Sequence, residues 1–178
     1  MTNTSRLIWV LLLLASTSAQ PCRAELTELQ IKSAYVFNFI KFVEWPVSTI
    51  KPGGRVRLCV IGNDGLRTSL STLGGRKVGE YELQVMPPLV RNDDLGICHV
   101  LYIGGQEQRR FLQVIKSLEE TPVLTISDIS DFAEHGGGIG LLYRESRMLF
   151  EVNLASTRKT GLRLSSQMLN LAANIFRR

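Results

Sequence analysis

Four side chains between residues 127 and 135 have the types needed for hydrolytic chemistry. They are Ser127, Asp128, Asp131 and His135. A serine that is activated by a histidine, itself oriented by a carboxylate, is the arrangement of a nucleophilic hydrolase. The group follows the apolar run 123–126, and α/β proteins often place their sites at strand ends. However, Ser127 does not lie in a Gly-x-Ser-x-Gly turn, and Ser127-Asp128 also suits the cap of a helix over 129–134. We favour the capping role and keep a hydrolase or small-ligand site as the alternative.

Two other features invite a chemical interpretation. The run Gly136-Gly137-Gly138-Ile139-Gly140 is rich enough in glycine for a phosphate loop, but it enters a strand, whereas phosphate loops open a helix. We therefore interpret it as a turn or a place of tight packing. His99 lies within an apolar run, which favours a hydrogen-bonded core imidazole over a catalyst or ligand. No clustered pattern predicts a metal or a cofactor, and the residues favour a binding or regulatory protein over an enzyme.

The elements that would position these residues alternate between apolar strands and amphipathic helices. Each strand is followed by a turn and a helical segment, which predicts an α/β fold with a mixed, largely parallel sheet flanked by helices. The predicted strands are 55–61, 78–86, 97–103 and 123–126, and the predicted helices between them are 66–73 and 108–118.

The last third of the chain follows a different pattern. Residues 139–143 and 148–152 are two strand-like runs that predict a C-terminal β-hairpin. A short helix over 153–160 should end at Gly161. Ser165 or Ser166 could then cap a final amphipathic helix that runs to about residue 176.

Residues 31–46, near the start of the mature chain, are the most aromatic part of the sequence. Their apolar side chains fall on one side of a helical wheel, which predicts a helix that packs on the sheet and ends near Trp45, before Pro46. Phe37 and Trp45 fall on the polar side of that wheel, beside Lys41. Because aromatic side chains are frequent in binding hot spots, Phe37, Lys41 and Trp45 are candidates for partner binding. In the alternative interpretation, the final helix or a loop covers the two aromatics.

Length, charge and the N-terminus limit the class of protein. The chain has 178 residues, 44% of them hydrophobic, which suits one domain over residues 25–178. Residues 1–24 are predicted to be a signal peptide, cleaved after Ala24 or after Ala19, with a lipid-modified Cys22 as a weaker alternative. Removing Arg6 and Arg23 leaves 21 − 2 = 19 basic against 16 acidic residues, a net charge of +3. This charge is too small and too dispersed to indicate nucleic acid as a partner.

The mature chain then retains two cysteines, Cys59 and Cys98. In an exported protein, two cysteines without other ligand residues nearby indicate a disulfide more than a metal site. The bond would close a loop of about 40 residues and stabilise the fold by about 4 kcal/mol in the chain-entropy model. Two buried thiols in neighbouring strands are the alternative.

Several motifs, in order along the chain, resemble those of the YfiR-like family of periplasmic proteins. The match begins with Glu28-Leu29-Gln30-Ile31-Lys32-Ser33-Ala34-Tyr35-Val36-Phe37-Asn38-Phe39-Ile40-Lys41-Phe42-Val43-Glu44-Trp45-Pro46. It continues through residues 58–62, 98–103, 123–128, 132–137, 150–155 and 161–166, and so covers nearly the whole mature chain.

The resemblance implies a periplasmic repressor that dimerises and is not an enzyme. Its expected partner is the periplasmic domain of an inner-membrane sensor, either a diguanylate cyclase of the YfiN type or a kinase. An outer-membrane-associated lipoprotein similar to YfiB would sequester the repressor and release the cyclase, which raises cyclic di-GMP and promotes biofilm formation. The resemblance also supports a Cys59–Cys98 disulfide. Some relatives have a second cysteine pair around the glycine-rich turn, and this sequence has none there.

Overall fold

The computed structural model describes residues 27–89, 92–145 and 147–178. The predicted signal peptide, both cleavage positions and Cys22 lie outside these residues. Within them, no helix is long and apolar enough to cross a membrane.

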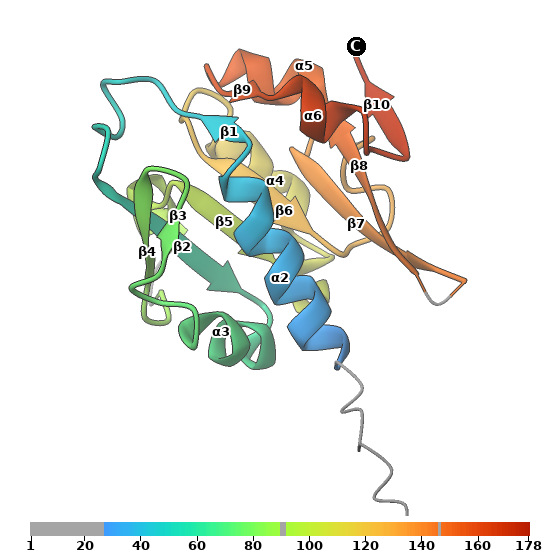
Figure 1. Cartoon of the computed structure of the whole chain (residues 1–178). Coiled ribbons are helices and arrows are strands. Elements are labelled where there is room, and N and C mark those ends of the chain that lie inside the picture. Colours follow the sequence, from blue (N-terminus) through green and yellow to red (C-terminus); the bar gives the residue numbers. More distant parts are fainter. Residues whose placement is uncertain (1–26, 90–91, 146) are drawn as a thin grey trace, which may run out of the picture.

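An eight-stranded sheet forms the centre of the protein, in the order β10-β8-β7-β6-β5-β2-β4-β3 (Figure 1). Pairing is parallel from β4 to β7 and between β8 and β10, and antiparallel for β7–β8 and β3–β4. The predicted mixed, largely parallel α/β fold is therefore confirmed. The strands are β2 Arg55–Ile61, β3 Lys77–Val78, β4 Tyr81–Val85, β5 Val100–Ile103, β6 Leu124–Ser127, β7 Ile139–Arg144, β8 Arg147–Asn153 and β10 Asn174–Phe176.

Alternate residues of the central strands face two separate hydrophobic clusters, because successive strand side chains point to opposite faces. In β2, Leu58 and Val60 belong to one cluster and Cys59 to the other. In β5, Tyr102 faces the first cluster and Leu101 the second. Burial on both sides explains the continuous apolar runs from which these strands were predicted.

Helices cover both faces of the sheet. Helix α2 (Glu28–Ile40) crosses one face with α3 (Asp64–Ser71) beside it, and α4 (Phe111–Ser117) lies on the opposite face (Figure 1). Two 3₁₀ helices, η1 (Asn92–Ile97) and η2 (Gly105–Glu107), flank β5. The Cys59–Cys98 disulfide ties β2 to the segment before β5, with the two Cα atoms 5.9 Å apart.

Helix α2 ends earlier than predicted. A capping box at Thr27 and Gln30 opens it, but it stops at Ile40 rather than near Trp45. The chain then forms β1 (Val43–Glu44), which pairs antiparallel with β9 (Arg163–Leu164). Pairing with a strand distant in sequence ends the helix there, five residues before the position that local periodicity indicated.

The end of the chain also differs from its prediction. The β7–β8 hairpin and the short helix α5 (Leu154–Lys159) form as expected. The predicted final helix, in contrast, shrinks to α6 (Ser166–Leu169), after which β10 joins the sheet beside β8. The free edge of β8 satisfies the backbone of β10, and this outweighs the helical pattern of the sequence.

Two further predictions were wrong in detail. In place of one strand over 78–86, residues 77–85 form the two strands β3 and β4, joined by a turn at Gly79, whose φ of 61° favours glycine. Residues 129–136 form successive turns, in place of the predicted helix over 129–134.

Candidate functional site

Trp45 is buried, so its predicted place on the surface is wrong. Its side chain is 6% exposed and its ring contacts Tyr81 edge-on, with 5.8 Å between the ring centroids. Its indole Nε1 donates to the backbone oxygen of His99 at 3.3 Å. The reason is the early end of α2. In the extended chain around β1, Val43 and Trp45 point inward and Glu44 outward.

Phe37 and Lys41 keep their predicted positions near the surface. Phe37 is half-buried, and Lys41 is exposed with its ammonium 5.4 Å from the centroid of the Phe37 ring. Lys41 also donates to the Asn38 side chain at 2.8 Å. The pair therefore presents an aromatic edge and a positive charge at the end of α2.

An apolar groove of about 350 Å³ opens beside Lys41, and we call it the α2 groove. Its walls come from α2, β8 and the C-terminal segment, and consist of Tyr35, Asn38, Phe39, Lys41, Phe42, Phe150, Met168 and Leu171. Tyr35, Phe39 and Phe150 stack edge-on, with Phe39 and Phe150 centroids 4.9 Å apart. Leu171 is 72% exposed at the rim. The exposed leucine and the aromatic rings form a contiguous apolar patch, a feature that marks protein-contact sites.

The predicted hydrolase residues are not brought together as a catalytic set. Ser127 is fully buried, and its Oγ donates to the Ile103 oxygen at 2.6 Å and accepts from the Ile129 N–H at 3.0 Å. His135 is exposed, with its Nδ1 2.8 Å from the backbone oxygen of Asp131. Ser127 thus stabilises a turn, much as the capping interpretation predicted, although no helix follows.

Asp128 takes part in a partly buried ion-pair cluster that the sequence analysis missed. The ammonium of Lys32 lies 2.5 Å from Asp128 Oδ2 and 2.6 Å from Glu28 Oε1. Burial disfavours the charged form of Lys32, but the two carboxylates outweigh it and raise its pKa. The fully buried Tyr102 lies close by, where burial and the charge of Asp128 raise the pKa of its hydroxyl. Together these residues attach the start of α2 to the ends of β5 and β6.

His99 is a core histidine, as predicted. It is 2% exposed, and its Nδ1 accepts from the Arg57 N–H at 3.1 Å. Burial, reinforced by the positive charge of Arg57, lowers its pKa to about 4. His99 is therefore neutral at physiological pH.

The crevice where α/β proteins usually bind ligands is closed by backbone contact. The sheet changes direction between β2 and β5, and ligands commonly bind at the carboxyl ends of such strands. Gly62 follows β2 and Gly104 follows β5. A Cβ atom added to Gly104 would lie 2.2 Å from the Gly62 oxygen. The two loops touch at their backbones, which leaves no room for a ligand between them.

The glycine-rich run serves tight packing, as predicted. A Cβ atom on Gly137 would lie 2.1 Å from the Phe132 ring, and one on Gly138 would lie 2.9 Å from the Thr125 oxygen. In the described part of the chain, no group of three or more His, Cys, Asp or Glu side chains is arranged to hold a metal ion.

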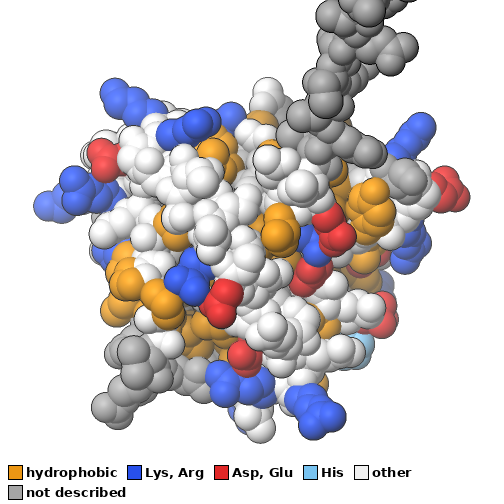
Figure 2. All heavy atoms as spheres, turned by 90° about the horizontal axis from the view of Figure 1, so that it is seen from below, with side chains coloured by type: hydrophobic (Ala, Val, Ile, Leu, Met, Phe, Trp, Pro, Cys, Tyr) orange, Lys and Arg blue, Asp and Glu red, His pale blue; other side chains and the backbone are white. Residues whose placement is uncertain are grey.

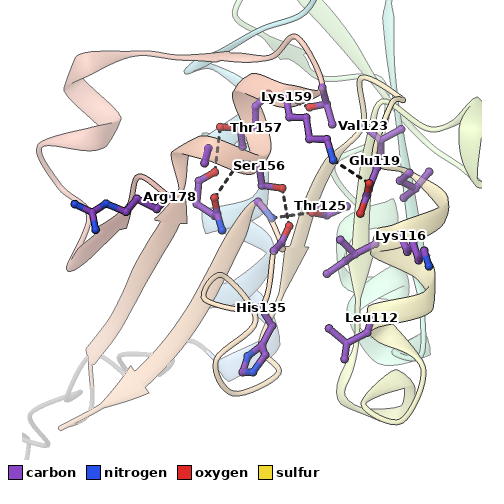
Figure 3. Close-up of a pocket in the computed structure, with 17 residues that line it drawn as sticks. Leu112, Lys116, Glu119, Val123, Thr125, His135, Ser156, Thr157, Lys159 and Arg178 are labelled. Atoms are coloured by element: carbon purple, nitrogen blue, oxygen red, sulfur yellow. Dashed lines mark hydrogen bonds and ion pairs between the residues drawn. The ribbon is translucent and has the colours of Figure 1, made fainter.

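A second groove, of about 460 Å³, lies between α4 and α5, and most of its polar groups are already bonded (Figure 3). Thr125 Oγ1 accepts from the Gly138 N–H, and Ser156 Oγ donates to the Gly136 oxygen. Lys159 pairs with Glu119 at 2.9 Å, and the Arg178 guanidinium points away from the groove. These internal bonds leave little polar chemistry for a ligand.

The fold and the grooves define a class of protein. It is an α/β protein with an apolar groove, and the candidate hydrolase residues among its described residues do not form a catalytic triad. Comparison with known families then identifies the chain. It belongs to the YfiR/HmsC-like family, whose pattern matches residues 29–173. It is thus a periplasmic regulatory protein of the YfiR type.

Two solved structures share the fold. A conserved domain protein from Vibrio cholerae O1 biovar El Tor has a TM-score of 0.56 at 10% identity, covering 85% of this chain and 61% of that one. An ABC domain from Streptococcus pneumoniae, solved in complex with L-Trp, has a TM-score of 0.51 at 8% identity, covering 83% and 60%. The chain thus spans about three fifths of each of these proteins, and the likeness concerns the fold.

Proposed function

We propose that this protein, exported by removal of residues 1–24, represses a membrane-anchored diguanylate cyclase of the YfiN type by binding its periplasmic domain through the α2 groove. Capture of the repressor by a YfiB-like lipoprotein releases the cyclase, which raises cyclic di-GMP and promotes biofilm formation. The proposal includes a homodimer of single-domain protomers (residues 25–178). It rests on family membership and on one structural observation, the exposed apolar groove with Lys41 at its rim.

The groove has the chemistry of a protein contact. Leu171 presents apolar surface to solvent, and the packed rings of Tyr35, Phe39 and Phe150 offer a firm floor. A partner side chain that fills the groove would gain about 25 cal/mol for each Å² of apolar surface removed from water. Lys41 would add a positive charge at the rim that favours an acidic group on the partner, and the Phe37 ring, next to Lys41, would extend the contact outside the groove.

Charge at the surface does not indicate nucleic acid. Figure 2 shows Lys and Arg side chains scattered among acidic and hydrophobic groups on the face in view, with no continuous basic stripe. The overall charge is likewise modest, at +5 for the full chain.

The test compares two hydrophobic residues with nearly equal exposure to solvent. Leu171, at the groove, is 72% exposed, and Val47, in a loop outside it, is 74% exposed. Leu171→Glu should weaken binding to the purified periplasmic domain of a YfiN-type cyclase by about 10-fold or more, whereas Val47→Glu should not. Phe37→Ala and Lys41→Glu should each have smaller effects in the same direction. Calorimetry measures the affinities, and equal loss with both glutamate variants would contradict the groove as the contact.

A further inference from the structure

The β7–β8 hairpin extends beyond the rest of the sheet. Strand β6 pairs with β7 only at Ile139 and Gly140, and β10 pairs with β8 only from Glu151 onward. The outer part of the hairpin is therefore a two-stranded ribbon that projects from the body (Figure 1). Such a ribbon has little packing to stabilise it by itself.

Two arginines face each other near the tip of this ribbon. Arg144 and Arg147 are direct cross-strand partners, and both are exposed. Neither makes an ion pair with any residue that the structure describes. Like charges directly opposite each other destabilise a strand pair. An anion bound between the two guanidinium groups would remove this repulsion.

The same face of the ribbon carries exposed apolar surface. Because side chains alternate along a strand, Leu142 and Leu149 lie on the same face of the ribbon as Arg144 and Arg147. Leu142 and Leu149 are themselves cross-strand partners, and on this face they are the pair next to the arginines. Leu149 is 37% exposed. We call these four residues the arginine face. On the other face, Met148 is buried, and its backbone oxygen accepts from the Tyr35 hydroxyl at 2.8 Å.

We infer that the arginine face is a docking surface for an acidic patch on a protein partner. Guanidinium groups bind carboxylates in a bidentate geometry, and a leucine pair next to them supplies apolar contact area. A face that carries both guanidinium groups and leucine side chains is suited to bind a protein surface with carboxylates beside apolar residues. Insertion into a bilayer, by contrast, would place the two guanidinium groups in hydrocarbon without a counter-charge, which is costly. The inference adds a second contact surface to the proposed function. It rests on the proposed function only because the first binding probe is the periplasmic domain of a YfiN-type cyclase.

A charge-reversal experiment tests the inference with a matched control. The variant Arg144→Glu with Arg147→Glu should bind the periplasmic domain of a YfiN-type cyclase about 30-fold more weakly at low ionic strength. The control, Lys51→Glu with Lys77→Glu, changes two other exposed basic residues and the same total charge, and should bind like the wild type. The difference between the variants should shrink as salt is added. Equal affinity of the two double variants would overturn the inference.

Two further experiments are needed. The first distinguishes a protein partner from a membrane, and the second tests the inference if the proposed cyclase partner does not bind. Binding to phosphatidylglycerol vesicles that is lost in Arg144→Glu/Arg147→Glu would assign the face to the membrane and overturn the inference. If the cyclase domain does not bind the wild-type protein at all, a photo-crosslinking residue at position 149 is used in intact cells. Crosslinks to a protein segment rich in Asp and Glu, lost on charge reversal, would support the inference. Crosslinks to lipid, to uncharged segments, or none at all would overturn it.

Discussion

The carboxyl ends of β5 and β6 and the α2 groove use their side chains in opposite ways. At the strand ends, Ser127 and Asp128 are committed to a turn and to the ion pair with Lys32, and the backbone closes the adjacent crevice. In the α2 groove, Leu171 and the edges of aromatic rings remain exposed. The residues that resemble catalytic machinery therefore stabilise the fold, while apolar residues that resemble core remain available for a partner.

Among the groups that stabilise the fold, the Cys59–Cys98 disulfide, at the amino end of β5, should have the largest effect. Replacing Cys59 and Cys98 with alanine should lower the free energy of unfolding by about 4 kcal/mol, because the unfolded chain loses the constraint of a 39-residue separation. Urea unfolding of the variant against the oxidised wild type measures the difference. Mass spectrometry of the oxidised protein should find the two cysteine peptides linked. Two free thiols would refute the bond.

Breaking the ion pair between Lys32 and Asp128 should have the next largest effect on the free energy of unfolding. Asp128→Asn should lower the free energy of unfolding by about 3 kcal/mol, because it leaves a buried ammonium with only the exposed Glu28 as a counter-charge. Chemical denaturation measures the loss, and Asp131→Asn, at an exposed turn position, is the control. The idea would be wrong if the two variants were equally stable.

His99 should make stability depend on pH. Its pKa of about 4 in the folded chain lies below its ordinary value of 6.5, so between these values the unfolded chain binds a proton that the folded chain does not. The free energy of unfolding should therefore fall as pH drops from about 6.5 to 4, by up to about 3 kcal/mol. His99→Asn keeps an acceptor for the Arg57 N–H and should lack this part of the slope. Parallel slopes for wild type and variant would contradict the assignment.

Local sequence patterns predicted the parts of the fold that local interactions determine. Strand β2 was predicted with its observed bounds, because burial on both faces leaves a continuous apolar run. The family and the sheet type followed from such runs and from the aromatic segment. The end of α2 and the final helix were wrong because β9 and β8, distant in sequence, pair with those segments.

The candidate site shows the same limit. The burial of Trp45 follows from the β1–β9 pairing, so a helical wheel placed it on the wrong side. Lys32 and Asp128 are separated by 96 positions, and no local pattern connects them. Phe37 lies within α2 and Lys41 directly follows it as the C-cap, and both were placed correctly near the surface.

The most direct test of the central claim is the cyclic di-GMP level in cells that carry the protein together with its cognate membrane cyclase. A strain with Leu171→Glu at normal periplasmic abundance should have raised cyclic di-GMP, like a strain that lacks the protein, because the proposed contact between the α2 groove and the cyclase is lost. A strain with Val47→Glu should match the wild type. Wild-type cyclic di-GMP in the Leu171→Glu strain would contradict the account.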